Sequence, residues 1–126
     1  IFNHAWVRIF MFAGLEGENI NRRYLGIVRR RLFQPLCREL RAREGRVSPE
    51  RFPLTEAELE ACWRMHGGFY YMAIRRWVYH LPIPRDLDAA VEQGIDVFLR
   101  GTPALMRRAV PAASSPALRW LSVSQR

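Results

Sequence analysis

The chain has 126 residues, enough for one domain with a modest hydrophobic core. Hydrophobic residues make up 49% of it and charged residues 25%, which is typical of a globular domain and excludes a disordered or fibrous chain. No apolar run is long enough to span a bilayer, and no signal peptide is evident, so we expect a cytoplasmic protein without a membrane partner. Because the first residue is not Met, we expect a fragment, a processed chain or a record that lacks its amino-terminal part.

The formal net charge is +8, from 20 basic residues that are all Arg and 12 acidic residues. Such an excess permits attraction to nucleic acid or another polyanion. The uniform use of Arg indicates coding bias rather than selection for phosphate binding. The densest basic group also lacks the glycines and stacking aromatics of a single-strand binder, so a solvated helix face is favoured over a nucleic-acid surface. This group comprises Arg22, Arg23, Arg29, Arg30 and Arg31.

Apolar residues at helical spacing predict a short first helix over residues 2–13, closed by Gly14 and Gly17. A longer helix is predicted from about Glu18 to Glu44, and Pro35 inside it should bend it. Residues 45–53 contain two prolines amid charged residues, which is typical of a connecting loop.

The third predicted helix begins at a clear N-terminal capping signal. Thr55 can cap the helix through its hydroxyl, while Glu58 reaches back to the amide of Thr55. The helical pattern runs on through Trp77 until Pro82 and Pro84, which cannot continue a helix.

Asp86 is a natural cap for a fourth helix, and Gly101, followed by Pro103, is expected to end it. We therefore expect a helical domain over residues 1–101 and a tail over residues 102–126 with short helical turns at 104–108 and 117–121. No segment shows convincing strand alternation, so the predicted fold is all-α.

The third and fourth predicted helices, whose starts and ends are marked by the residues above, have an unusually broad apolar surface. On the third helix only Glu60, Arg64, Tyr71 and Arg75 form a clear polar wedge. A helix that packs against a single core needs a narrower apolar arc, which favours burial on two sides and a four-helix interface with a second copy. The candidate dimer-interface residues are Met72, Arg76, Tyr79, Val91, Gly94, Ile95 and Phe98.

Glu58, Cys62 and His66 lie one helical turn apart on one face, but no fuller ligand set accompanies them, so core packing is favoured over a metal site. Cys62 or Cys37 could form a dyad with His66, yet no oxyanion loop or orienting carboxylate is evident. We therefore expect no enzymatic activity, no metal and no cofactor, with a metal or thiol hydrolase as the enzyme alternative. The two cysteines are expected to be free buried thiols.

Aromatic residues crowd the middle of the chain, where a pocket between helices would suit a mostly apolar small molecule. Gly67 and Gly68 interrupt this region, and they indicate either a close helix crossing or a local opening beside a ligand cavity. The candidate effector-binding residues are Phe10, Cys62, His66, Phe69 and Tyr70.

This succession of helices and breaks resembles the carboxy-terminal regulatory domain of the TetR family of bacterial transcriptional regulators. The segments that carry the resemblance are Phe10–Gly17, Arg30–Leu36, Ile74–Trp77, Asp86–Asp88 and Val97–Gly101.

The resemblance implies a helical bundle that forms a homodimer through its last two long helices and binds a small, often hydrophobic effector among the helices. Effector binding in such regulators, often repressors, moves an amino-terminal helix-turn-helix domain. DNA contact is accordingly expected only through such a domain, which is missing from this chain. The alternative is a small helical adaptor that binds another protein with the same faces.

Overall fold

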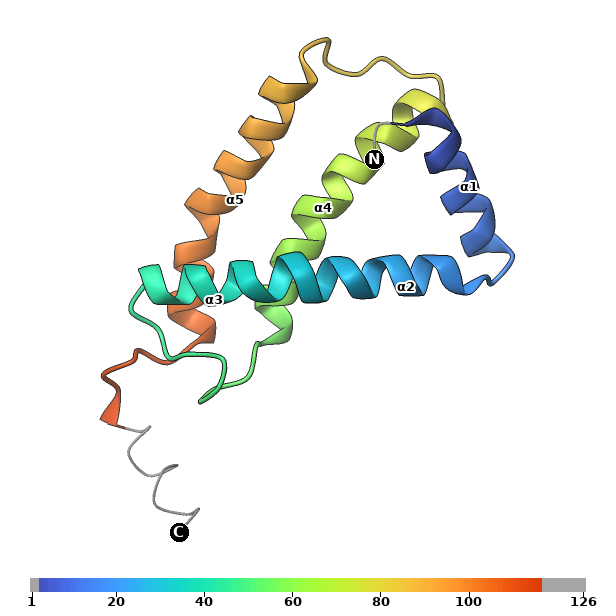
Figure 1. The fold of residues 1–126 in the computed structure, drawn as a ribbon. Coiled ribbons are helices and arrows are strands. Elements are labelled where there is room, and N and C mark those ends of the chain that lie inside the picture. The colour runs from blue at the N-terminus through green and yellow to red at the C-terminus, as the bar shows by residue number, and fades with distance from the viewer. Residues whose placement is uncertain (1–2, 117–126) are drawn as a thin grey trace.

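The structure is a computed structural model that describes residues 3–116 and is all-helical over them (Figure 1). The helices are α1 (His4–Leu15), α2 (Asn19–Val28), the π-helical turn η1 (Arg29–Phe33), α3 (Gln34–Arg43), α4 (Glu56–Trp77) and α5 (Leu87–Ala109). In Figure 1, α1, the rod formed by α2, η1 and α3, and α4 make the three sides of a triangle, and α5 runs antiparallel to α4. The expectation of an all-α chain is confirmed for this part of the sequence.

The first helix begins one residue after Asn3, whose side-chain oxygen accepts a hydrogen bond from the amide of Trp6 at 2.9 Å. Gly17 adopts a positive φ of 75°, which lets the chain turn into α2. The predicted short helix is thus confirmed, although it ends at Leu15 instead of residue 13.

The predicted long helix is also present, since α2, η1 and α3 follow one another without a break from Asn19 to Arg43. Proline at position 35 has no amide hydrogen to donate to the preceding turn. The chain forms the wider π-helical turn immediately before it, with the amide of Gln34 donating to the carbonyl of Arg29. Pro35 therefore lies in the first turn of α3, where a proline is tolerated.

The start of α4 is as predicted. The hydroxyl of Thr55 accepts a hydrogen bond from the Glu58 amide at 3.3 Å, and the Glu58 carboxylate accepts one from the Thr55 amide at 2.8 Å. After Trp77 the chain leaves the helix, and His80 adopts a positive φ of 55° ahead of the two prolines.

The start of α5 is also as predicted, with Asp86 accepting from the Ala89 amide at 2.9 Å, but the predicted end at Gly101 is wrong. The helix continues through Pro103 to Ala109, past the boundary expected at residue 101, and includes the turn expected at 104–108. A proline inside a helix costs about 3 kcal/mol. Burial of Met106 in the same stretch offsets that cost. The turn expected at 117–121 lies outside the described residues.

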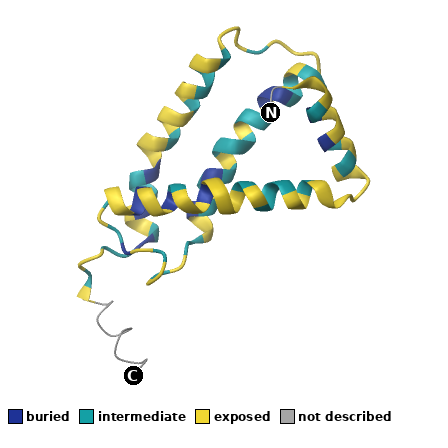
Figure 2. Cartoon of the chain, in the orientation of Figure 1, coloured by how far each residue is buried: buried dark blue, intermediate teal, exposed yellow. Residues whose placement is uncertain are grey.

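Two clusters of buried residues lie where α3, the first turns of α4 and the last turns of α5 meet, and Val7 in α1 and Ala73 in α4 are buried as well (Figure 2). One cluster joins Phe33, Cys37 and Cys62, and a second joins Val47 with Val110. Backbone hydrogen bonds link residues 45–47 to residues 111–113 beside the second cluster, so the loop after α3 is held by the end of α5.

Gly67 and Gly68 lie inside the continuous helix α4, so the helix does not open there; a local opening was one of the two alternatives that the sequence left open. A Cβ atom added at either glycine would meet no other atom within 4 Å in the described chain, which also excludes a close helix crossing within it. By contrast, a Cβ at Gly94 would lie 2.7 Å from a ring carbon of Phe69.

Replacement of Gly67 by Ala is expected to raise the free energy of unfolding by about 0.5–1 kcal/mol, because Ala favours the helix and meets no obstacle. The matched variant Gly94→Ala gains the same propensity but must displace the Phe69 ring, so it should be less stabilising. Urea unfolding at one protein concentration measures both. Equal gains would contradict the close packing of Phe69 on Gly94.

Candidate functional site

A groove with a volume of about 540 Å³ lies between α4 and α5. This size is within the range of small-molecule sites. Its lining comprises Ala61, Arg64, Met65, Gly68, Phe69, Met72, Ala90, Gln93, Gly94, Val97, Phe98, Gly101, Thr102 and Leu105. We call this surface the α4–α5 groove. Arg64 is the one charged residue among the 14 that line it, so the groove is an apolar surface on the outside of the chain.

The predicted dimer-interface residues fall partly on this groove. Met72, Gly94 and Phe98 line it. Arg76, Tyr79 and Ile95 are exposed but do not line it, and Val91 is half-buried. Val97 also lines the groove and is 67% exposed, but it is not among the predicted residues. Its position three residues after Gly94 was the available signal, because residues three apart on a helix lie on the same face.

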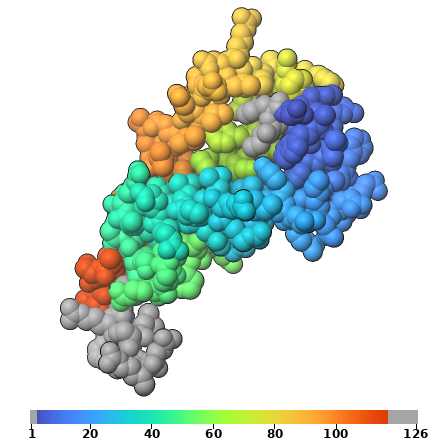
Figure 3. Space-filling view, in the orientation of Figure 1, coloured from blue at the N-terminus to red at the C-terminus, as the bar shows by residue number. Residues whose placement is uncertain are grey.

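Behind the groove, the opposite side of α4 faces α1 and the α2–α3 rod, which cover much of it in the space-filling view (Figure 3). Aromatic rings gather here in a group that we call the aromatic cluster, made of Trp6, Phe10, Tyr24 and Tyr70. The ring centroids of Phe10 and Tyr70 are 5.6 Å apart, and those of Trp6 and Phe10 are 4.8 Å apart and stacked. Two predicted effector-binding residues, Phe10 and Tyr70, therefore lie together.

His66 lies one helical turn before Tyr70, with its ring 5.9 Å from that of Phe33. The His66 Nε2 atom and the Tyr70 hydroxyl are buried, and neither has a hydrogen-bond partner within the described chain. Burial lowers the pKa of His66 and raises the pKa of Tyr70, which keeps both side chains neutral near pH 7. This side of α4 therefore carries packed aromatic rings and two uncharged polar atoms.

The two other predicted effector-binding residues lie elsewhere. Phe69 lines the α4–α5 groove, on the other side of α4 from Tyr70. Cys62 is fully buried in the core, with its Sγ 3.6 Å from the Sγ of Cys37, and both thiols are free as expected. Among residues 3–116, no three His, Cys, Asp or Glu side chains are grouped so that they could hold a metal ion.

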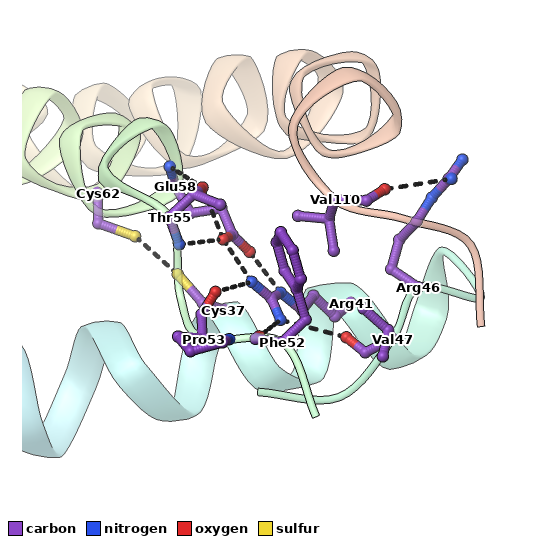
Figure 4. Close-up of polar contacts among 10 residues, drawn as sticks. All are labelled: Cys37, Arg41, Arg46, Val47, Phe52, Pro53, Thr55, Glu58, Cys62 and Val110. Atoms are coloured by element: carbon purple, nitrogen blue, oxygen red, sulfur yellow. Dashed lines mark hydrogen bonds and ion pairs between the residues drawn. The ribbon is translucent and has the colours of Figure 1, made fainter. Parts of the chain in front are cut away.

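Glu58, considered above as a metal ligand, is instead half of a buried ion pair with Arg41 (Figure 4). Arg41 Nε and Nη2 each donate to the Glu58 carboxylate at 2.7 Å, and the guanidinium also donates to three loop carbonyls. Those carbonyls belong to Val47, Phe52 and Pro53. The pair was not predicted because Arg41 is one of 20 arginines in the sequence. Its position one turn after Cys37, on the inward face, was the available signal.

The ion pair predicts a pH dependence of stability. Burial is the largest influence on the Glu58 pKa and raises it, but hydrogen bonds from Arg41 and Thr55 and the charge of Arg41 together outweigh burial and lower the pKa. The pKa of Glu58 in the folded chain is lower than its value of about 4.3 in the unfolded chain, so the ionised carboxylate stabilises the fold at pH values above about 4.3. This contribution is lost as the pH falls through the folded-state pKa. The free energy of unfolding should therefore fall below about pH 4.

Urea unfolding at a series of pH values measures this dependence. The variant Glu58→Gln is the control, because it removes the titrating group and should flatten that part of the profile. A wild-type profile that matches the Glu58→Gln profile in shape would contradict the assignment.

No family model matches the chain, and no curated protein or solved structure is significantly similar to it. No helix among the described residues combines the length and hydropathy needed to cross a membrane. Arg29, Arg30 and Arg31 are all exposed on the rod.

Proposed function

We propose that this chain is the ligand-responsive regulatory domain of a TetR-like bacterial transcriptional regulator, which forms a homodimer through α4 and α5 and binds a small, mostly apolar effector. The observation that carries the proposal is the apolar α4–α5 groove on the last two long helices. Those are the helices through which the family that the sequence resembles forms its dimers.

The composition of the groove supports a second copy as its occupant. The centres of protein interfaces are poor in charged residues and well packed, and the lining of the groove contains one charged residue among 14. Helices α4 and α5 have 22 and 23 residues, so each is about 33–35 Å long. Two such pairs related by a two-fold axis bury the same surface on both copies and form a closed four-helix interface.

The effector is proposed to bind on the opposite side of α4, at the aromatic cluster with His66. A ligand there would contact α1 and α4 together, and it would give the His66 Nε2 atom and the Tyr70 hydroxyl the partners that residues 3–116 do not provide. A ligand that prefers one arrangement of these helices shifts the population towards it. In the parent regulator that shift changes the spacing of two DNA-reading domains.

Sedimentation equilibrium over a range of micromolar concentrations tests the dimer. We expect a reversible dimer. A monomer throughout would contradict the proposal and favour the adaptor alternative, in which the same groove takes an amphipathic helix of another protein.

The effector site is tested by screening planar, mostly apolar molecules through the fluorescence of Trp6 and the other tryptophans. A ligand at the proposed site should bind about 2- to 12-fold more weakly to Tyr70→Phe, which loses one hydrogen bond. Tyr71→Phe is the matched control, because Tyr71 is exposed and outside the cluster. Equal affinities for the two variants would place the ligand elsewhere.

A further inference from the structure

The thiol pair between α3 and α4 is the feature that the proposed function leaves unused. Cys37 and Cys62 are 1% and 0% exposed, and their sulfur atoms are 3.6 Å apart. One helical turn further along α3 lies Arg41, and one turn earlier on α4 lies Glu58. The two helices therefore meet at two adjacent contacts, a hydrogen bond between free thiols and an ion pair (Figure 4).

We propose that Cys37 and Cys62 are a redox modification site, at which a small hydroperoxide such as hydrogen peroxide joins α3 to α4 through an intramolecular disulfide. The sulfur atoms are already in contact, so the bond needs them to approach from 3.6 Å to about 2.05 Å. Two neighbouring sulfur atoms on separate helices also distinguish this site from a single buried cysteine, which has no resolving partner.

Either sulfur could donate the hydrogen bond that the two thiols share, and we take Cys37 as the donor and Cys62 as the attacking sulfur. A hydrogen bond from Cys37 lowers the pKa of Cys62, and the same hydrogen bond, together with burial, raises the pKa of Cys37. The Cys62 thiolate attacks one peroxide oxygen, the O–O bond breaks, and the released hydroxide takes a proton to become water. The product is a sulfenic acid on Cys62.

In the second step the Cys37 sulfur attacks the Cys62 sulfur, the S–O bond breaks, and the departing hydroxide takes the Cys37 proton as a second water. Two thiols and one peroxide thus give one disulfide and two waters, and the protein loses two hydrogen atoms. The Arg41–Glu58 pair favours this second step, because it holds the two helices in register while the sulfur atoms react.

The test is to treat the folded chain with hydrogen peroxide, block the remaining thiols in denaturant, and measure the intact mass and the tryptic peptides. We expect the mass of a single chain, with no disulfide to a second copy, that is lighter by two hydrogen atoms. The peptide 32–38 should be joined to the peptide 52–64, and dithiothreitol should reverse the change fully. Cys37→Ala should instead gain oxygen at Cys62, because the resolving thiol is absent.

Two outcomes would overturn the proposal. One is wild-type protein whose two thiols stay reduced while its methionines are oxidised, which would show that the oxidant does not reach the pair. The other is oxygen gain at Cys62 in the wild-type chain at the same rate as in Cys37→Ala, which would show that Cys37 does not resolve the sulfenic acid. Neither outcome bears on the dimer or the effector site, so the proposed function is tested separately.

Discussion

Replacement of Arg41 by Met is expected to lower the free energy of unfolding by about 3–5 kcal/mol. The substitution leaves the Glu58 carboxylate buried without its counter-charge, and it removes the donor from the carbonyls of Val47, Phe52 and Pro53. Domains of this size are stable by about 5–15 kcal/mol, so the loss is a large part of the total. Urea unfolding followed by circular dichroism measures it.

Arg43→Met is the matched control, because the pair of Arg43 with Glu39 lies on the surface, with side chains 68% and 60% exposed. An exposed pair of this kind contributes at most about 0.5 kcal/mol. If Arg41→Met leaves too little folded protein to measure, Arg41→Met combined with Glu58→Gln should recover stability, since no unpaired charge is then buried. Equal losses for Arg41→Met and Arg43→Met would contradict the structural role of Arg41.

Replacement of Val97 by Glu is expected to weaken the proposed dimer by about 100-fold or more. A two-fold axis would bring one new carboxylate from each copy into an apolar interface, and burial of unpaired charges costs several kcal/mol, of which about 3 kcal/mol corresponds to 100-fold. The fold of the single chain should be preserved, because Val97 is 67% exposed within it. Sedimentation equilibrium gives the dissociation constant.

Leu15→Glu is the control for that experiment. Leu15 is an even more exposed apolar residue, at 81%, but it lies at the end of α1 and outside the groove. A dimer that survives Val97→Glu and dissociates on Leu15→Glu would assign the interface to α1 rather than to α4 and α5.

The features predicted correctly from the sequence are those that neighbouring residues determine. The capping box of Thr55 and Glu58 and the cap of Asp86 each depend on groups three residues apart, so they were visible without knowledge of the fold. The end predicted at Gly101 was wrong because burial of Met106 against distant parts of the chain prolongs α5. Tertiary contacts of this kind override local helix-stop signals.

The candidate site shows the same limit. Phe69 and Tyr70 were assigned to one cavity, but neighbouring residues on a helix point about 100° apart, and the structure places them on different sides of α4. Phe10 and Tyr70 do lie together, although the pairing of α1 with α4 was not readable from either segment alone. The inward position of Arg41 could be read from the sequence, but its pairing with Glu58 could not, because the pair joins α3 to α4 across an intervening loop.

The hydrogen bonds between residues 45–47 and 111–113 have a consequence for the order of assembly. The Val47 amide donates to the Pro111 carbonyl, and the Ala113 amide donates to the Gly45 carbonyl. The loop that supplies carbonyls to Arg41 is thus fastened by the last described part of the chain. During synthesis, the surroundings of the Arg41 guanidinium can close only after residues 111–113 have emerged from the ribosome. In a nascent chain that ends before residue 110, Arg41 and the loop around it would stay exposed to solvent and proteases.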